Sequence, residues 1–374
     1  MRAGRSAVIA LAVVATLLLA GLVLMPLFFD QPEGFQTEDL VAPEVELDQQ
    51  PVPWKPRPIT LDSLNHSMQL SWAMTPIYAD YGGVLNLSVV SQSPNQIYIY
   101  GFGLEWPDHG LETSRTCSVN LTSEGKESLG LLFFTGPEAP GREDYRIFVE
   151  MAVQAPEGTE WNDYGRMDGK LWDTEVLGSI GPTVYDVSLN PRNYYDKATA
   201  LMDGDAVSAL VTQVQAQVPG PYSLQQLLYV FDWVRENIEY TADPSDKWQS
   251  SMDTLVLRGG DCEDHAILVA TMVRELGGCA RFNLIDGHAF ATVFIGDKYT
   301  DLTAIKMAIS SHYGTLMPVH YLLDDAGYWM TMDTVGFPYA GGLTASSAPV
   351  VDGDVDWTFE GTDILIKVDA VPDQ

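Results

Sequence analysis

Basic residues are scarce in this sequence of 374 residues. It contains 20 lysine and arginine residues against 51 aspartate and glutamate residues, which gives a formal net charge of −31. Proteins that bind nucleic acids depend on Lys and Arg to neutralise backbone phosphates, so this composition argues against a nucleic-acid partner. We interpret the acidity as a solvated surface, in preference to a specific cationic partner.

Cysteine is also rare, with Cys117, Cys262 and Cys279 as its three examples. Cysteines outside the cytoplasm tend to pair, and an odd number leaves at least one unpaired. Cys117 and Cys279 fall in different predicted domains, so we do not expect a bridge between them. A zinc site at Cys262 and His265 would need further ligands at a usable spacing. The sequence therefore predicts no metal ion and no other cofactor.

One long apolar run without charge is present, at residues 7–29. A helix of this length covers about 34 Å at ~1.5 Å per residue, which is enough to cross a hydrocarbon core of ~30 Å. Arg2 and Arg5 precede the run and Asp30 follows it, so the positive-inside rule places the N-terminus in the cytoplasm. We expect residues 1–29 to be a single-pass membrane anchor, with the bulk of the chain extracytoplasmic. A cleaved secretory signal is the alternative, and it would export the same body.

The next two segments differ sharply in composition. Residues 30–58 are rich in proline and acidic side chains and poor in large apolar ones, which is typical of an extended stalk. Residues 59–155 contain short runs of alternating polarity separated by Gly, Pro, Ser and Asn, which predict a β-sandwich of immunoglobulin-like size. Residues 156–204 show no clear period, and we interpret them as a connection.

A helix that starts with a cysteine is predicted in the second half of the chain. Gly259 and Gly260 lead to Asp261 and Cys262, and apolar residues then recur at nearly helical spacing as far as Leu276. The first turn of a helix offers unpaired backbone N–H groups and the positive end of the helix dipole, and both favour a thiolate. Cys262 is therefore the candidate nucleophile.

A histidine opens the strand predicted after this helix. Asp286-Gly287 forms a turn, and residues 288–295 read as a strand that begins with His288. A cysteine on a helix, followed by a histidine on a strand and then a carboxylate, is the order of a nucleophile, its base and the group that orients the base.

The sequence of these segments resembles the transglutaminase-like superfamily, which has a papain-like fold. Residues 260–266, Gly-Asp-Cys-Glu-Asp-His-Ala, match the cysteine motif of that family, and residues 287–289, Gly-His-Ala, match its histidine motif. The resemblance covers residues 205–345 and leaves residues 346–374 as a C-terminal strand or tail. It implies an α+β fold class, with a transglutaminase-like domain that follows the β-sandwich and the transmembrane helix.

Two aspartates compete for the third catalytic position. Asp333, followed by Thr334, copies the family's pattern of an aromatic residue, a strand and Asp-Thr more closely. Asp301 lies thirteen residues after His288, on what we expect to be the return strand of a hairpin. Either carboxylate would fix the imidazole tautomer and stabilise its cation. We favour Asp333 and keep Asp301 as the alternative.

The expected chemistry is acyl transfer through a thioester. The Cys262 thiolate would attack an amide or peptide carbonyl of a protein or peptide substrate at the cell surface, with His288 as base and then acid. The backbone N–H of Cys262 would hold the oxyanion, with Trp248 or Gln249 as a second donor. The resemblance covers both hydrolysis and transfer to an amine. The alternative is a non-catalytic surface protein, for binding or adhesion, that uses the same scaffold.

Overall fold

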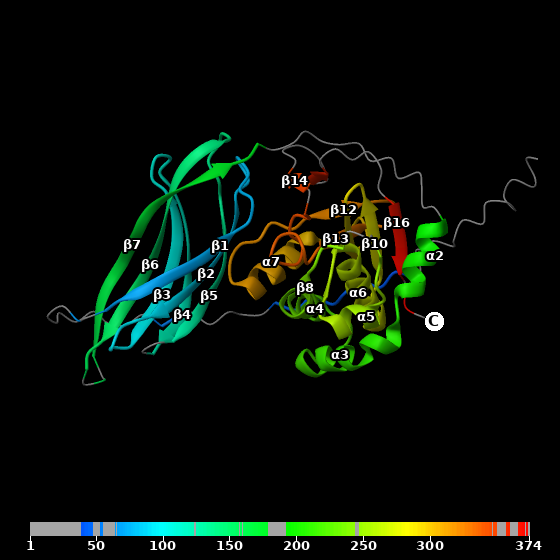
Figure 1. Cartoon of the computed structure of the whole chain (residues 1–374), viewed down its shortest axis with the longest axis horizontal. Helices are drawn as coiled ribbons and strands as arrows, with labels where there is room; N and C mark the ends of the chain where they lie inside the picture. Colours follow the sequence, from blue (N-terminus) through cyan, green and yellow to red (C-terminus); the bar gives the residue numbers. More distant parts are fainter. Residues whose placement is uncertain are drawn as a thin grey trace, which may run out of the picture.

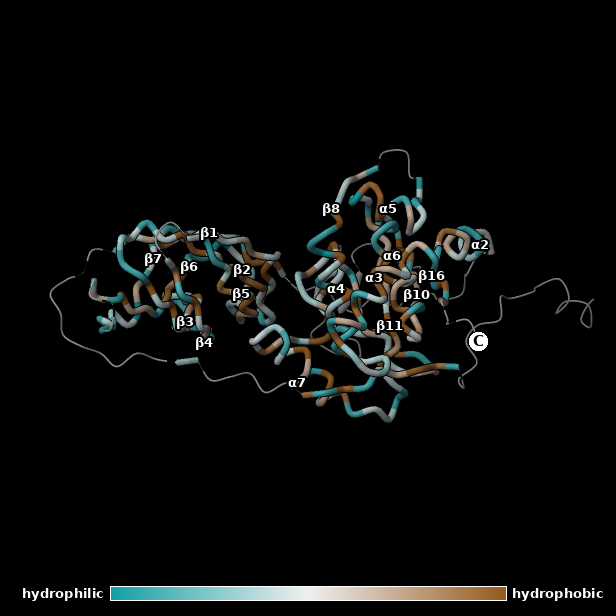
Figure 2. The backbone as a smooth tube through the Cα atoms, turned by 90° about the horizontal axis from the view of Figure 1, so that it is seen from below, coloured by the Kyte–Doolittle hydropathy of each residue, from teal (hydrophilic) through white to brown (hydrophobic). Residues whose placement is uncertain are grey.

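A computed structural model describes most of the chain beyond the N-terminal run. The described residues are 39–47, 53–54, 64, 66–122, 125–156, 158, 160–178, 192–243, 247–345, 347–349, 357–359, 366–370 and 372. A group of long β-strands lies beside a second group that combines helices with strands (Figure 1). Figure 2 shows the same two groups from below, with hydrophobic segments inside each of them.

The first group consists of two antiparallel sheets. One sheet has the order β1-β2-β5 and the other has the order β4-β3-β6-β7. The strands are β1 (Met68–Met74), β2 (Gly83–Ser91), β3 (Ile97–Trp106), β4 (Leu111–Leu121), β5 (Lys126–Phe134), β6 (Gly141–Gln154) and β7 (Trp161–Val176). Both sheets contribute side chains to one hydrophobic cluster, which includes Leu87 and Leu132 from the first sheet and Phe102 and Ile147 from the second. The alternation that the sequence shows therefore separates a shared core from the two outer faces.

Strand β7 corrects the predicted domain boundary at residue 155. It pairs with β6 in a register that runs from Gly141–Val176 to Gln154–Trp161, so these residues belong to the sheet and are not a connection. Its polar side chains alternate weakly because β7 lies at the edge of the sheet, where both faces keep contact with solvent. Because both faces are exposed, the sequence of β7 lacks the polar–apolar alternation from which a strand is predicted.

The second group is built around a five-stranded sheet with the order β12-β13-β11-β10-β16, in which every pair is antiparallel. Its strands are β10 (Ala280–Ile285), β11 (His288–Gly296), β12 (Tyr321–Leu323), β13 (Tyr328–Met332) and β16 (Ile366–Ala370). Two short pairs lie outside this sheet, β8 (Glu239–Tyr240) with β9 (Gly259–Gly260), and β14 (Ser347–Pro349) with β15 (Trp357–Phe359). Because β16 pairs with β10, this sheet extends past the boundary that we placed at residue 345, and a strand of the predicted C-terminal segment is part of it.

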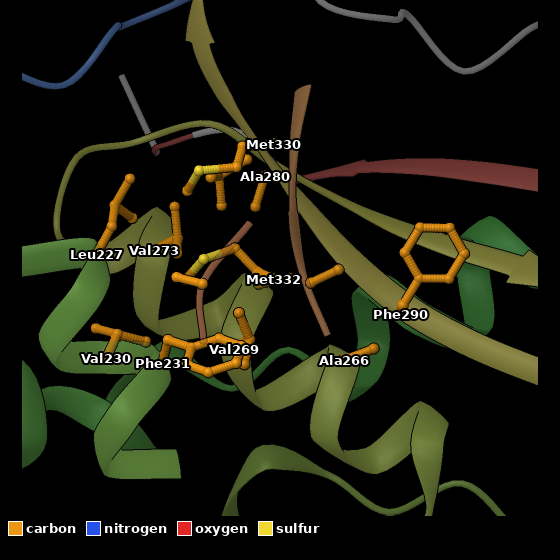
Figure 3. Packing of buried hydrophobic residues seen from close by; sticks show 14 of the residues in the cluster. Leu227, Val230, Phe231, Ala266, Val269, Val273, Ala280, Phe290, Met330 and Met332 are labelled. Carbon is orange, nitrogen blue, oxygen red and sulfur yellow. The ribbon is translucent and has the colours of Figure 1, made fainter. Parts of the chain in front are cut away.

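Helices pack against this sheet and against one another. They are α2 (Arg192–Leu201), α3 (Gly204–Gln217), α4 (Leu224–Asn237), α5 (Ser251–Leu257), α6 (Cys262–Glu275) and α7 (Leu302–Tyr313). Helix α6 packs against β10 and β11, and its Val269 and Val273 lie in the same cluster as Met330 and Met332 of β13 (Figure 3). Burial of α6 fixes the helix start, and with it the backbone of Cys262.

Helix α4 begins at a capping residue and buries one apolar face. Ser223 caps it and accepts a hydrogen bond from the Gln226 backbone N–H, and Leu227, Phe231 and Val234 are buried on one face. Figure 3 places Leu227 and Phe231 on the side of α4 that faces α6. The stripe is therefore core and carries no chemistry, as its period predicts.

Part of the predicted stalk lies against the second group of elements. The backbone N–H of Glu44 donates to Tyr222 O at 3.0 Å, and the N–H of Leu224 donates to Glu44 O at 2.8 Å. Leu40 and Val45 pack on the hydrophobic cluster of the second group. Residues 39–47 are therefore not part of an extended stalk, because their apolar side chains pack against the second group.

The predicted anchor at residues 1–29 lies outside the described residues. Within the described ranges, which begin at residue 39, no helix has the length and apolar character needed to cross a membrane.

Polar contacts of Arg115, Tyr78 and Tyr81 help to join the two groups of elements. The Arg115 guanidinium donates to Tyr313 O at 2.7 Å, Tyr78 Oη donates to Ser347 O at 3.0 Å, and Tyr81 Oη lies 3.2 Å from His320 Nε2. Tyr78 also belongs to the hydrophobic cluster of the second group. The first group of elements, which we call the strand module, is therefore packed against the second group and is not only a spacer.

Candidate active site

The turn before Cys262 is held by a short parallel pairing. Strand β9 pairs with β8, and the backbone N–H of Thr241 donates to Gly260 O at 2.8 Å. A Cβ at Gly260 would lie 2.6 Å from the Cβ of Asp264, so a side chain at this position would displace the first turn of α6. Asp261 is the N-cap residue and Cys262 is the first residue of the helix. The glycine thus lets the chain approach closely enough for the cysteine to start the helix.

Replacing Gly260 by alanine should destabilise the fold, because the added methyl group overlaps Asp264. We expect the free energy of unfolding to fall by about 1–3 kcal/mol, the usual cost of overpacking. Urea denaturation measures it, with Gly178→Ala as control, since a Cβ at Gly178 meets its nearest neighbour at 3.9 Å. Equal midpoints for the two variants would show that Gly260 is not required by packing.

Asp264 fastens the segment that precedes the cysteine. Its Oδ1 accepts a hydrogen bond from the Gln249 backbone N–H at 2.6 Å, and its Oδ2 accepts from Gln249 Nε2 at 2.6 Å and from the Asp261 backbone N–H at 3.3 Å. The side chain of Asp264 is fully buried. Asp264 therefore engages the Gln249 amide, and the role of oxyanion donor that we expected for Gln249 is not supported by this geometry. Trp248 remains at the site, as a wall of the cavity described below.

His288 is the first residue of β11. The turn before it uses Gly287 at φ +74°, which is a conformation that suits glycine. The imidazole stacks on Phe290, with ring centroids 5.9 Å apart and an angle of 18° between the planes. Its Nε2 lies 2.7 Å from Asp333 Oδ2. The other ring nitrogen, Nδ1, is therefore the one left for proton transfer.

Asp333 directly follows β13, whose pairing with β11 brings it to His288. The register joins Ala291 to Met332, so the end of β13 lies beside the start of β11. Asp333 Oδ2 also accepts from the Ala345 N–H at 2.8 Å, and Oδ1 accepts from the Val335 N–H at 3.0 Å. Burial would raise the pKa of this carboxyl, but the charge and hydrogen bond of His288 together with the two N–H groups hold the pKa below its usual value. Asp333 is thus ionised and aimed at the imidazole.

The residue after Asp333 is fixed by two further side chains. Thr334 Oγ1 lies 2.8 Å from Nδ1 of His265, and Thr334 O accepts a hydrogen bond from Arg235 at 2.8 Å. Burial lowers the pKa of His265, so this imidazole is neutral. His265, which we had weighed as a zinc ligand, instead supports the loop that carries Asp333.

Asp301 lies elsewhere. It caps α7, where its Oδ1 accepts from the Thr303 backbone N–H at 2.9 Å, and these hydrogen bonds lower its pKa. The return strand that we expected at this position is wrong, because β13 pairs with β11 and residues 302–313 form a helix that buries Ile305 and Ile309. The structure brings Asp333 to His288 and leaves Asp301 exposed at a helix end.

The Cys262 thiol has an acidic neighbour. Its S–H donates to Glu263 Oε2 at 3.1 Å. Burial and the Glu263 carboxylate raise the pKa of Cys262 to about 12, against a smaller lowering by the Ala289 backbone N–H. We expected the helix N-terminus to favour a thiolate, and the structure differs: burial and the adjacent carboxylate outweigh the helix start. The interaction with Ala289 also places the sulfur beside the strand that His288 opens.

Glu263→Gln should make the thiol more reactive at neutral pH. The substitution removes a negative charge and a strong acceptor, so the pKa of Cys262 falls and the thiolate fraction at pH 7 rises, by about tenfold for each unit of the decrease. The pH dependence of iodoacetamide labelling measures this, with Glu236→Gln on exposed α4 surface as control. An unchanged labelling profile in Glu263→Gln would contradict the inferred role of the carboxylate.

Cys262 and His288 line one cavity of about 560 Å³. The walls include residues that the sequence did not point to, among them Tyr194 and Lys197 of α2 and Ile366 of β16. Lys197 Nζ lies 3.7 Å above the Trp248 ring, and Tyr194 stacks on the same indole with centroids 6.1 Å apart. No local sequence signal predicts these walls, because Tyr194 and Lys197 lie more than sixty residues before Cys262 and Ile366 lies more than a hundred residues after it.

The other two cysteines are free and buried. Cys117 lies on β4. Cys279 directly precedes β10, and its S–H is directed to Asp39 O at 3.5 Å. Burial raises the pKa of both thiols. The partly exposed Cys262 is therefore the accessible thiol of the three.

One family model matches the segment that contains this site. Residues 208–334 match the family model of the Transglutaminase-like superfamily, and this segment contains Cys262, His288 and Asp333. A crystal structure described as "a Putative Cysteine Protease from Cytophaga hutchinsonii" aligns with 82% of this chain and 94% of its own, at 14% identity and a TM-score of 0.24. No curated protein matches the chain. The family match does not reach the strand module, whose immunoglobulin-like character stays a prediction.

Proposed function

We propose that the transglutaminase-like segment makes this protein a cysteine enzyme that forms a thioester from an amide or peptide bond. One observation carries the proposal. A cysteine at the start of α6 and a histidine at the start of β11 line the same cavity, and that histidine lies 2.7 Å from a buried aspartate. A nucleophile, a base and a group that orients the base are the parts that covalent acyl transfer needs.

The proposed first step moves one proton. The sulfur of Cys262 attacks the carbonyl carbon while its proton passes to Nδ1 of His288, and Asp333 stabilises the imidazolium through Nε2. The oxyanion is held by the Cys262 backbone N–H, which lies in the first turn of α6 and has no acceptor within the helix. The imidazolium then gives its proton to the leaving amine, and the thioester remains.

The proposed second step returns the enzyme to its starting state. Water or a primary amine attacks the thioester, His288 removes the proton of the attacking group, and the Cys262 thiol is released with that proton. Water gives a carboxylic acid and an amine gives a new amide. Because the thiol has a raised pKa, we propose that proton transfer accompanies the attack and that no stable thiolate–imidazolium pair precedes it.

Peptide mass spectrometry tests the proposed reaction. The full chain is incubated with glutamine-containing peptides, with and without a primary amine, and the products are analysed for new termini, deamidation and amine adducts. Products that are lost in Cys262→Ala support the proposal, and the product type decides between hydrolysis and transfer. Identical product patterns in both proteins would overturn it.

A non-catalytic role in surface binding or adhesion is the second candidate. The observation that favours it is the Cys262 thiol, which is hydrogen-bonded to Glu263 and protonated in the free protein. An absence of any acyl adduct on Cys262, with folding intact, would select this role.

We further propose that residues 7–29 anchor the protein in a membrane, with the domain that contains Cys262 and an immunoglobulin-like β-sandwich on the extracytoplasmic side. The length of the apolar run and the flanking Arg5 and Asp30 support this placement. Fractionation tests it: the full chain should sediment with membranes and resist carbonate, whereas residues 31–374 should remain in the supernatant. Full-length protein in the soluble fraction would contradict an anchor.

A further inference from the structure

Two buried carboxylates flank the candidate nucleophile. Asp261 and Glu263 are 7% and 6% exposed, and both line the cavity that contains Cys262. Asp286, on the turn before His288, contributes a third carboxylate to the same cavity and is exposed. Carboxyl groups therefore precede and follow Cys262 in the sequence, and a third lines the same cavity.

Among the described residues, these carboxylates are not paired with a cationic side chain. In the described part of the chain, none of the three forms an ion pair with a lysine or arginine, and Asp261 Oδ1 is buried without a hydrogen-bond partner. The one cationic side chain in the cavity wall, Lys197, has its ammonium over the Trp248 ring. Burial and the neighbouring Glu263 carboxylate raise the pKa of Asp261. Because ionised carboxylates are costly to bury without a partner, a bound cation would lower the electrostatic cost of this arrangement.

We propose that the cavity is a binding site for a positively charged substrate group, a protonated amine or a guanidinium, next to the reacting carbonyl. The inference rests on the proposed function and names its substrate class. Asp261 and Glu263 would hold the cation from inside the cavity, and Asp286 would attract it at the entrance.

An organic cation fits this site better than a metal ion. Within the described ranges, no three His, Cys, Asp or Glu side chains gather closely enough to hold a metal ion. The aromatic wall already accepts an ammonium, since Lys197 Nζ lies 3.7 Å from the centroid of Trp248. A bound cation paired with Glu263 would also draw this carboxylate away from the Cys262 thiol, whose S–H it now accepts.

Charged thiol reagents of matched size test the site without knowledge of the substrate. Methanethiosulfonates that carry an ammonium, a neutral methyl group or a sulfonate react with a thiolate to form a mixed disulfide and release methanesulfinate. Rates are measured on the full chain by intact-protein mass spectrometry, with Cys262→Ala to subtract any reaction at the buried cysteines. We expect the cationic reagent to react about 10-fold or more faster than the anionic one, the lower end of the range for electrostatic focusing in a charged cleft.

Variants locate the selectivity. Glu263→Gln and Asp286→Asn should each reduce the ratio of cationic to anionic rates several-fold, and Asp205→Asn, an exposed acidic residue on α3, should leave it unchanged. Asp286 is exposed, so its variant keeps the test valid if the variant at buried Glu263 fails to fold. An equal reduction by Asp205→Asn would mean that the net charge of the protein, and not this cavity, causes the selectivity.

The outcomes separate this inference from the proposed function. If the neutral reagent does not label Cys262, the nucleophile itself is contradicted. If the neutral reagent labels Cys262 and the charged reagents react equally, the enzyme proposal stands and the cation site is overturned.

The cation could come from either partner in the reaction. Peptide amides that carry lysine or norleucine beside the reacting residue distinguish the sources in a single turnover. Faster thioester formation with lysine places the cation on the acyl donor. Equal thioester formation, with partition toward protonated amines over neutral nucleophiles that is lost in Asp286→Asn, places it on the acceptor. Neither effect, in an enzyme that acylates, contradicts the site.

Discussion

His288→Ala is expected to slow formation of the acyl-enzyme by about 10²–10⁴-fold, which is the usual contribution of a positioned acid–base group. The effect should be large here because burial and Glu263 keep the Cys262 thiol protonated, with its pKa raised to about 12. A thiol that is already ionised would tolerate loss of the base, whereas this one needs an acceptor for its proton as it attacks. Neither Glu263 nor water replaces an imidazole that can also donate to the leaving group.

The measurement for His288→Ala is the burst of p-nitrophenol from p-nitrophenyl acetate, followed by stopped-flow absorbance. His312→Ala is the matched control, because His312 Nε2 lies 2.7 Å from Asp232 of α4 and His312 does not line the cavity. Similar burst rates for wild type and His288→Ala would remove His288 from the chemistry. A comparable loss in His312→Ala would point to a general effect of histidine removal on folding.

The second large effect concerns Asp333→Asn, with Asp301→Asn as its control. The new amide could still lie beside His288, but it would lack the charge that stabilises the imidazolium formed during attack and could present an N–H to Nε2, which favours the wrong tautomer. We expect the acylation rate to fall by about 10² or more, as loss of a buried hydrogen-bonded charge partner implies. Asp301→Asn should keep the wild-type rate, because its carboxylate caps α7.

The thermal stability of Asp333→Asn and Asp301→Asn must be measured together with their acylation rates. Asp333 also accepts the N–H groups of Val335 and Ala345, so its replacement loosens the loop that follows β13. A thermal melt shows whether Asp333→Asn is folded at the temperature at which its rate is taken. Equal rates in the two variants, or a slower Asp301→Asn, would contradict the assignment of the third member.

The segment that contains Cys262 and His288 could be predicted because its signals are local. Ser223 starts α4 and its period buries Leu227 and Phe231, and the glycine pair before Cys262 allows the turn that starts α6. His288 follows a glycine turn and opens a strand of alternating residues. Each of these features depends on a backbone conformation or an apolar period within a few residues, and such local features can be predicted from the sequence.

The choice between Asp333 and Asp301 required the structure. Each is preceded within five residues by a tyrosine, and each is followed within two residues by a threonine. What separates them is which strand pairs with β11, a long-range contact that β13 makes and the segment after Gly296 does not. The strand register, and no local signal, brings the carboxylate to the imidazole.

The other incorrect predictions share a physical cause, which is that each feature depends on contacts between distant parts of the chain. The thiolate that we expected at Cys262 depends on the balance between a helix start and burial, and burial is a property of the whole fold. The strand β7 has too much exposed polar surface to show a period, and β16 is an edge strand added from the far end of the chain. The segment near Glu44 packs on α4 although its composition favours an extended chain.

The central claim is that Cys262 carries the acyl group, and intact-protein mass spectrometry of an acid-quenched reaction with p-nitrophenyl acetate tests it most directly. We predict one acetyl group per chain within the burst, mapped to Cys262 and removed by hydroxylamine, with none in Cys262→Ala. Acetylation of wild type and Cys262→Ala to the same extent, or acetyl groups confined to lysines, would contradict the account.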